Sequence, residues 1–399
     1  MLASLSLIFI VGLAMGAICQ KLKLPRIIGM LVTGIVLGPY VLDLLDPSIL
    51  SISAELRKMA LIIILLKAGL SLDLKDLKKA GRSAVLLSFV PASFEIAGYV
   101  LCVPAILGIT RVEAAVMGAV LGAVSPAVVI PRMVALMEKK YGTEKAIPQM
   151  VMAGASCDDI FVIVLFTTFL SIAQGGHANV LDFVNIPVSI VLGIILGAVT
   201  GYGLYLFFET AYARKHCVRN SMKVIIVLGF SFLLSAVEGW LEEKISVSGL
   251  LAVVAMACVI KMKSPAFVSK RLSEKFGKLW LAAEVVLFVL VGAAVDISYT
   301  LSAGLSAVLM IFVALFFRSV GVLLCVAGTR LIWKEQLFCV IAYLPKATVQ
   351  AAIGSVPLAA GLSCGKIVLS VAVLAIIITA PLGAIGMDVA YQRLLEKEN

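Results

Sequence analysis

Charged side chains are scarce in this sequence. Asp, Glu, Lys and Arg make up 14% of its 399 residues, whereas a soluble protein carries about 25%. Hydrophobic residues make up 62%. Polar stretches long enough to form a separate soluble domain are also missing. These shortages exclude an ordinary globular protein and predict an all-α chain that crosses a lipid bilayer many times.

Histidine is rare, and cysteines with paired spacing and phosphate-binding motifs are absent from the sequence. The two histidines, His177 and His216, fall in expected loops, and the eight cysteines are scattered, mostly within apolar runs. Such cysteines are typical of buried thiols rather than of a disulfide framework or a metal cluster. The sequence has no GxxxxGK[ST] motif, which excludes a P-loop ATPase. The net charge of +10 comes from basic residues that separate apolar segments, so we expect no nucleic-acid partner.

Apolar windows long enough to cross a bilayer recur along the whole chain. A spanning helix needs about 20 such residues. The first window lacks the positive n-region of a secretory signal, so we interpret it as a spanning helix. We predict thirteen crossings, at about 2–20, 25–42, 54–72, 81–106, 112–136, 146–172, 184–208, 220–240, 246–262, 276–295, 301–328, 336–361 and 366–392.

Basic residues fall mostly on one side of these crossings. Loops after odd-numbered helices, together with the C-terminus, carry 24 of the 33 Lys and Arg residues. The opposite loops carry five, namely Arg57, Lys58, Arg111, Lys244 and Lys366. Because cytoplasmic loops are rich in Lys and Arg, we expect a multi-pass protein of the cell membrane with its N-terminus outside and its C-terminus in the cytoplasm.

Several charged residues nevertheless lie inside the predicted crossings. Lys67 and Arg132 are near helix ends, where their heads can reach the interface. Each charge at a helix centre costs about 2.5 to 3.5 kcal/mol. Three acids and two bases are placed there, and they leave one negative charge unbalanced, which favours a site for one monovalent cation or one proton. These five residues are Glu95, Asp158, Asp159, Arg318 and Lys346.

The two aspartates, Asp158 and Asp159, are consecutive in the apolar sixth crossing. Neighbouring residues on a helix point about 100° apart. One carboxylate can therefore face a basic partner while the other faces a cavity. The small residues just before the pair, Gly154, Ala155 and Ser156, allow another backbone to come close.

Prolines interrupt two of the crossings. Pro126 and Pro131 lie in the fifth, where each proline frees a carbonyl group about four residues upstream, at Gly122 and Ala127. Pro345 and Pro357 lie in the twelfth.

Each interrupted helix is the middle one of three. The triplet 4-5-6 carries Glu95 and the aspartate pair, and the triplet 11-12-13 carries Arg318. Because the fourth helix starts inside and the eleventh outside, the triplets run in opposite orientations. Paired interruptions in inverted repeats are typical of a midplane ion site in a secondary transporter.

Three stretches, "LKLPRIIGMLVTGIVLGP", "CDDI" and "LPKATVQAAIG", resemble the cation/proton antiporter superfamily. The last stretch resembles the NHA-type sodium/proton exchangers in particular. This resemblance spans essentially the whole chain and implies a homodimer with inverted repeats and a mobile core containing two crossed, unwound helices. The implied division has core helices at about 81–172 and 301–392, dimerisation or scaffold helices at about 1–72 and 184–262, and a linking helix at about 276–295.

The resemblance also implies roles for the intramembrane residues. Asp159 would be the principal cation ligand and proton carrier, with Asp158 and Ser125 as its partners. Arg318 would pair with Glu95.

For the remaining base, the resemblance implies that Lys346 neutralises the helix ends at the second crossing. If Lys346 also offsets Asp158, one carboxylate is left to carry one Na⁺ or one proton. Because an arginine such as Arg318 does not release its proton, we expect one-for-one, electroneutral exchange.

The function expected from these residues is secondary exchange of Na⁺ or Li⁺ for protons, without a cofactor. Potassium/proton exchange and sodium-coupled uptake of an organic anion on a similar fold are the alternatives. An intramembrane aspartyl protease would draw its two carboxylates from different helices, whereas these two are adjacent, so we do not expect an enzyme.

Overall fold

The computed structural model describes residues 1–22, 24–71, 81–175, 180–215, 220–241, 247–296 and 304–398, so the predicted loops with His177 and His216 lie outside it. Every regular element in these residues is a helix, apart from one isolated bridge between Tyr141 and Lys397. In this part of the chain, nine helical segments are long and apolar enough to cross a membrane. The protein is therefore an all-α, multi-pass membrane protein. Helices overlap all thirteen predicted ranges, but the number of thirteen crossings stays a prediction.

The chain divides into two compact units. The first comprises residues 1–57, 73–174 and 285–399, and the second comprises residues 58–72 and 175–284. Helices of the first unit are α1 (Leu2–Lys21), α2 (Arg26–Leu37), α3 (Pro47–Ser51), α6 (Gly81–Leu87), α7 (Val90–Leu107), α8 (Arg111–Leu121), α9 (Pro126–Glu138), α10 (Ile147–Gly175), α16 (Gly304–Val326), α17 (Trp333–Ala342), α18 (Thr348–Ile353), α19 (Val356–Ala359) and α20 (Gly365–Leu394). The second unit contains α11 (Val180–Lys215), α12 (Asn220–Leu241), α13 (Gly249–Lys263) and most of α4 (Ser53–Ser71) and α14 (Ala266–Ala293).

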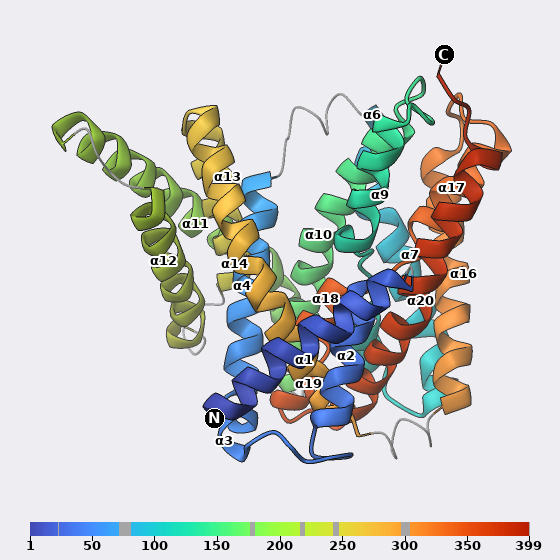
Figure 1. The fold of residues 1–399 in the computed structure, drawn as a ribbon, viewed down its shortest axis with the longest axis horizontal. Helices are drawn as coiled ribbons and strands as arrows, with labels where there is room; N and C mark the ends of the chain where they lie inside the picture. Colours follow the sequence, from blue (N-terminus) through green and yellow to red (C-terminus); the bar gives the residue numbers. More distant parts are fainter. Residues whose placement is uncertain are drawn as a thin grey trace. The chain divides into compact units, whose positions relative to one another are not determined.

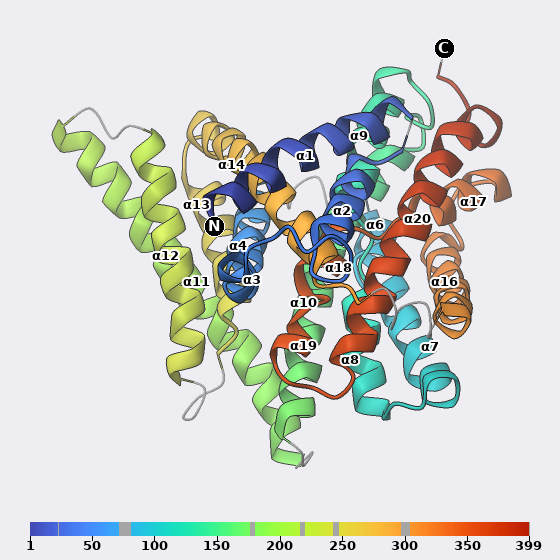
Figure 2. The same cartoon turned by 60° about the horizontal axis from the view of Figure 1, so that its bottom comes forward.

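In the first unit, helices distant in the sequence pack side by side. Helix α16 lies along α7, and α17 packs against α20 (Figure 1). The N-terminal helices α1 and α2 pack against each other (Figure 2). The α7–α16 contact brings together the two segments on which Glu95 and Arg318 were predicted.

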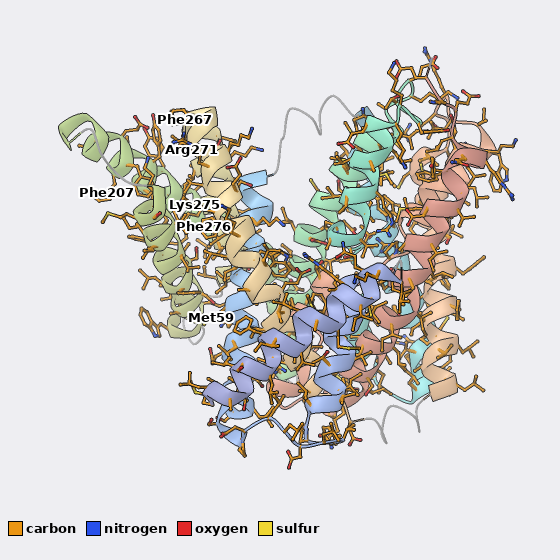
Figure 3. The ribbon with its side chains drawn as sticks, in the orientation of Figure 1. Met59, Phe207, Phe267, Arg271, Lys275 and Phe276 are labelled. Atoms are coloured by element: carbon orange, nitrogen blue, oxygen red, sulfur yellow. The ribbon has the colours of Figure 1, made fainter. Side chains whose placement is uncertain are left out.

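In the second unit, α11 and α12 both pack against α13 and keep apolar side chains on their outer faces. Phe207 on α11 and Phe267 at the start of α14 are 54% and 61% exposed, whereas Phe276 is buried (Figure 3). Large exposed apolar side chains of this kind suit a surface that faces lipid.

Some predicted boundaries are wrong. Helix α14 begins at Ala266, about ten residues before the predicted start, because its first turns are too polar for an apolar window but still form helical hydrogen bonds. Helix α2 ends at Leu37, where the backbone becomes extended at Gly38. The predicted crossing at 81–106 consists of two helices, α6 and α7, with Pro91 in the first turn of α7.

The structure also corrects the expectation for Arg132, because its head group pairs with an acid and does not simply extend to the membrane interface. Its guanidinium forms two hydrogen bonds of 3.1 Å with the carboxylate of Asp388 on α20. The pair joins α9 to α20, and its partly exposed position is consistent with only a small contribution to stability.

Glycines allow α2 to approach the last turns of α14 very closely. A Cβ atom added at Gly34 would lie 1.9 Å from the carbonyl oxygen of Val289, and one added at Gly292 would lie 2.2 Å from that of Leu31. Both distances are far below van der Waals contact, so each helix needs a glycine at this crossing.

We expect Gly34→Ala to lower the free energy of unfolding by about 1 to 3 kcal/mol, because the new methyl group meets rigid backbone. Thermal unfolding of the purified protein in detergent measures the change. Gly229→Ala is the matched control, since a Cβ atom there has no atom within 4 Å and alanine favours the helix. Equal melting temperatures for Gly34→Ala and Gly229→Ala would contradict the close crossing.

Candidate functional site

Two helix interruptions meet in the first unit. Helix α8 ends at Leu121 and α9 begins at Pro126, while α17 ends at Ala342 and α18 begins at Thr348. The backbone N–H of Ser125 in the first interruption donates a hydrogen bond of 2.8 Å to the carbonyl oxygen of Pro345 in the second. The predicted breaks at Pro126 and Pro345 are thus confirmed, and they touch.

Pro131 behaves differently from the prediction. It lies inside α9, which runs without interruption to Glu138. Helix α9 therefore tolerates this proline, as membrane helices do when neighbouring groups satisfy the backbone. Only the carbonyl group freed by Pro126, at Gly122, becomes part of the site.

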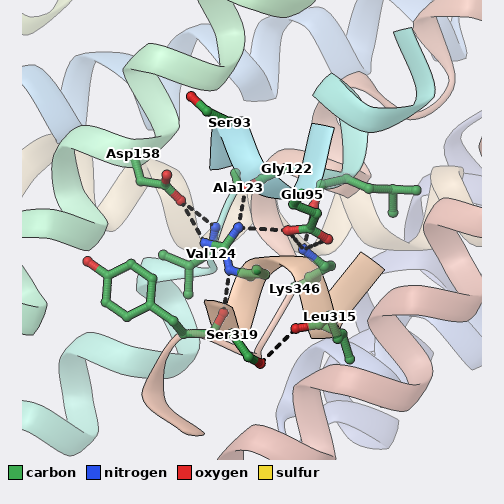
Figure 4. A network of polar contacts seen from close by, with 12 residues as sticks. Ser93, Glu95, Gly122, Ala123, Val124, Asp158, Leu315, Ser319 and Lys346 are labelled. Carbon is green, nitrogen blue, oxygen red and sulfur yellow. Dashed lines mark hydrogen bonds and ion pairs between the residues drawn. The ribbon is translucent and has the colours of Figure 1, made fainter. Parts of the chain in front are cut away.

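Arg318 lies at the centre of the site, fully buried on α16. Its Nε donates to the carbonyl oxygen of Tyr343 at 2.6 Å, and its Nη1 donates to the carbonyl oxygen of Gly122. The same guanidinium donates to the carboxylates of Glu95 at 2.8 Å and Asp158 at 3.1 Å (Figure 4). One side chain therefore satisfies a carbonyl group from each interruption and binds two acids.

Lys346 contacts a different acid from the one expected. Its Nζ lies 2.7 Å from Oε1 of Glu95 and also donates to the carbonyl oxygen of Leu121 (Figure 4). The expectation that Lys346 offsets Asp158 is therefore wrong, because the ammonium group points along the end of α8 to Glu95. Glu95 accepts from both buried bases, and its carboxylate is fully buried.

Two further polar side chains complete the interruptions. The amide nitrogen of Gln350 on α18 donates to the carbonyl oxygen of Ala123 at 2.8 Å. The hydroxyl group of Thr379 on α20 accepts a hydrogen bond of 2.9 Å from the backbone N–H of Lys346. These contacts leave the freed backbone groups paired inside the protein, as the interior of a membrane requires.

The two aspartates have different surroundings, although they are adjacent on α10. Oδ2 of Asp158 accepts from the backbone N–H of Val124 at 2.7 Å and from Arg318. Asp159 is 7% exposed and forms no hydrogen bond or ion pair with any residue in the described part of the chain. Asp158 is therefore the acid with a basic partner, and Asp159 is the acid without one.

Several oxygen atoms near the interruptions are buried without a hydrogen-bond partner among the described residues. They include Oδ1 of each aspartate, the hydroxyl group of Ser125, the hydroxyl group of Thr348 and Oε1 of Gln350. Hard cations prefer a set of ligands that consists of oxygen atoms. Within the described residues, no group of three or more His, Cys, Asp and Glu side chains could hold a metal ion.

A close approach also occurs one turn before the aspartates, as the small residues predicted. A Cβ atom at Gly154 would lie 2.2 Å from the hydroxyl oxygen of Tyr343. The nearest atom thus belongs to a side chain from the second interruption, and the expected backbone is also near, because the carbonyl oxygen of Ala84 on α6 would lie 3.4 Å from the same Cβ atom.

The sequence prediction found every charged member of the site and Ser125, but it missed the other neutral members. Gln350 and Thr379 are polar residues inside apolar helices, and that pattern could have marked them. Tyr343 contributes a carbonyl group and a ring whose centre lies 5.6 Å from the Arg318 guanidinium, and no sequence pattern predicts those contacts.

Comparison with known proteins agrees with this geometry. The family described as "Sodium/hydrogen exchanger, transmembrane" matches residues 5–388. Human sodium/hydrogen exchanger 9B2 is 36% identical over 390 residues, which are 94% of this chain and 70% of the relative. Human sodium/hydrogen exchanger 9B1 is 32% identical over 419 residues, covering 99% of this chain and 78% of the relative.

A solved structure shares the fold. The sodium proton antiporter MjNhaP1 from Methanocaldococcus jannaschii, at pH 8, superposes with a TM-score of 0.83 over 98% of this chain and 97% of that chain, at 21% identity. The matches to the exchanger family and to its curated relatives both extend over nearly the whole sequence. The chain therefore belongs to the transmembrane sodium/hydrogen exchanger family, which is a family of transporters and not of enzymes.

Proposed function

We propose that this protein exchanges Na⁺ or Li⁺ for protons by alternating access, one for one and without a cofactor. Asp159 carries the proposal, because it is a buried carboxylate that forms no ion pair with a base in the described part of the chain. The free oxygen of Asp158 and the hydroxyl group of Ser125 would join it as ligands of the cation. The cation is the substrate, and a proton takes its place on the same carboxylate.

Competition for one carboxylate would couple the two ions. A protonated Asp159 has no negative charge to hold Na⁺, and a Na⁺-bound Asp159 has no place for the proton. Each passage across the membrane would then carry one ion or the other, driven by their gradients.

The charge pairs support electroneutral exchange even though the expected partner of Lys346 was wrong. Arg318 binds both Glu95 and Asp158, and Lys346 binds Glu95. Two bases and two acids thus form a closed network that leaves Asp159 outside. Arg318 keeps its proton at every workable pH, so Lys346 is the only base of the network that could supply a second exchanged proton.

The same network disfavours uptake of an organic anion. Such a substrate needs a free positive group, but both buried bases of the site already bind carboxylates. Potassium/proton exchange remains the alternative, because an oxygen site can also accept K⁺. Internal pH of proteoliposomes after addition of Na⁺, Li⁺ or K⁺ separates these substrates.

Contacts at the starts of the broken helices support an arrangement of inverted repeats. Glu113 at the start of α8 accepts from Ser363, in the loop before α20. Glu335 at the start of α17 accepts from Lys145, in the loop before α10, at 2.9 Å. Each broken helix thus contacts the loop before the third helix of the other triplet, as two repeats related by a twofold axis would.

The proposal also covers the orientation of the protein in the membrane, its oligomeric state and its division into a scaffold and a mobile core. The positive loops favour a cell-membrane protein with the N-terminus outside and the C-terminus in the cytoplasm. We propose a homodimer in which helices at about 1–72 and 184–262 form the scaffold. The core at about 81–172 and 301–392 would move against this scaffold, with the segment at about 276–295 as a link.

Asp159→Asn should reduce Na⁺-driven proton flux in proteoliposomes to the level of empty liposomes, because an amide cannot exchange a proton for Na⁺. Asp158→Asn should be severely impaired but keep more activity, since Asp158 already has a basic partner. Asp388→Asn removes a carboxylate at the 55% exposed end of an ion pair and should stay active. Full flux in a folded Asp159→Asn protein would contradict the assignment.

The contact between Glu95 and Arg318 should appear in a double-mutant cycle. Glu95→Ala and Arg318→Ala each leave a buried charge with fewer partners, which costs about 3 to 5 kcal/mol. The double variant should lose less stability than the sum of the single losses. Chemical unfolding in detergent measures all four proteins, and strict additivity would mean that the two side chains do not interact.

The stoichiometry can be read from the effect of voltage. With one cation exchanged for one proton, a potassium-diffusion potential of either sign should leave the initial Na⁺/H⁺ exchange rate unchanged. If an inside-negative potential instead drives net Na⁺ extrusion, a second proton moves, and Lys346 is its expected source. Lys346→Arg then tests that source, because an arginine does not release its proton.

A further inference from the structure

A cavity opens in the first unit and shares no residue with the site described above. It has a volume of about 500 Å³. The start of α6, the loop before α10, and the end of α16 with the turn that follows it form its walls. Its charged lining residues are Arg82, Glu144, Lys145 and Arg330, and Met150 and Leu331 add apolar surface.

Two of the positive groups in this cavity are available to a ligand. Arg82 and Arg330 are exposed, and neither forms a hydrogen bond or ion pair with a residue in the described ranges. They come from segments about 250 positions apart, yet they line the same space. Guanidinium groups usually form paired hydrogen bonds with an oxyanion when one is at hand.

The third positive group is anchored in place. The ammonium group of Lys145 binds both oxygens of Glu335, at 2.9 and 3.0 Å, and lies 3.5 Å from Glu396. Hydrogen bonding to Glu335 raises the pKa of Lys145, so this group keeps its charge. Its side chain is still 25% exposed, and among the described lining residues one carboxylate, that of Glu144, stands against three cations.

We propose that this cavity binds a phosphate group, held between Arg82 and Arg330 with Lys145 beside it. The planar fork of a guanidinium matches phosphate geometry, and two forks can hold one group from two sides. Helix α16 and the segment Gly81–Leu107 both qualify as membrane spans, so the cavity lies at the ends of spanning helices. Basic pockets in such positions bind phosphorylated lipid headgroups. A lipid headgroup and free phosphate share the required chemistry.

Binding is measured on the full chain in detergent, by the shift of its thermal midpoint with ligand concentration. The probes are dioctanoyl phosphatidic acid, dioctanoyl phosphatidylcholine and inorganic phosphate. We expect phosphatidic acid to bind and phosphatidylcholine not to bind. Saturable binding of phosphatidic acid alone identifies a lipid headgroup as the source, and equal binding of inorganic phosphate identifies the free ion. Failure of both phosphatidic acid and inorganic phosphate to bind overturns the proposal.

The double variant Arg82→Ala/Arg330→Ala should weaken this binding about tenfold or more, because it removes two charged hydrogen-bond donors. Lys334→Ala/Arg393→Ala is the matched control, since it removes two exposed charges that do not line the cavity. Glu144→Gln should tighten binding, as it removes a negative group from the lining, and it keeps the test decisive if the arginine variant does not fold. A loss below threefold in the arginine variant, equal losses in the control, or weaker binding in Glu144→Gln overturns the proposal.

Discussion

The buried guanidinium of Arg318 is the group on which the other parts of the candidate site depend. Two helix interruptions leave carbonyl groups at a depth where lipid cannot satisfy them. Arg318 donates to one carbonyl group from each, at Gly122 and Tyr343. The carboxylates of Glu95 and Asp158 balance its charge. Because a guanidinium is planar and has five N–H groups, it can serve four acceptors at once, which the three donors of an ammonium group cannot do. The helix breaks and the charge pairs therefore form a single arrangement.

This arrangement gives the two adjacent aspartates different surroundings. Asp158 turns toward Arg318 and the backbone N–H of Val124, so its charge stabilises the crossing. Asp159 points about 100° away on the same helix and forms no ion pair with a base among the described residues. A carboxylate that stabilises the crossing would be difficult to protonate without weakening the fold. In the proposed exchange, the neighbouring carboxylate of Asp159 can bind and release ions without breaking these contacts.

Prediction from the sequence succeeded where a pattern has a local physical cause. Apolar windows located the helices, and Pro126 located the first interruption, because both effects act within a few residues. Prediction failed where partners are distant. Lys346 was assigned to Asp158, yet it binds Glu95, 251 positions away, because the crossing of the two breaks decides which carboxylate its stem reaches. The buried carboxylate of Glu335 and its partner Lys145 went unnoticed for the same reason.

The sequence by itself determined the membrane setting, the approximate helices, the two interruptions at Pro126 and Pro345, and the presence of charged residues inside the predicted crossings. These properties follow from hydropathy, from the missing N–H of proline and from counting charges, and none of them needs a contact between distant residues. Only the tertiary structure decided which acid lacks a base and which carbonyl groups the bases satisfy. Those choices depend on distances of about 3 Å between side chains on three separate helices and one helix interruption, and packing alone sets such distances.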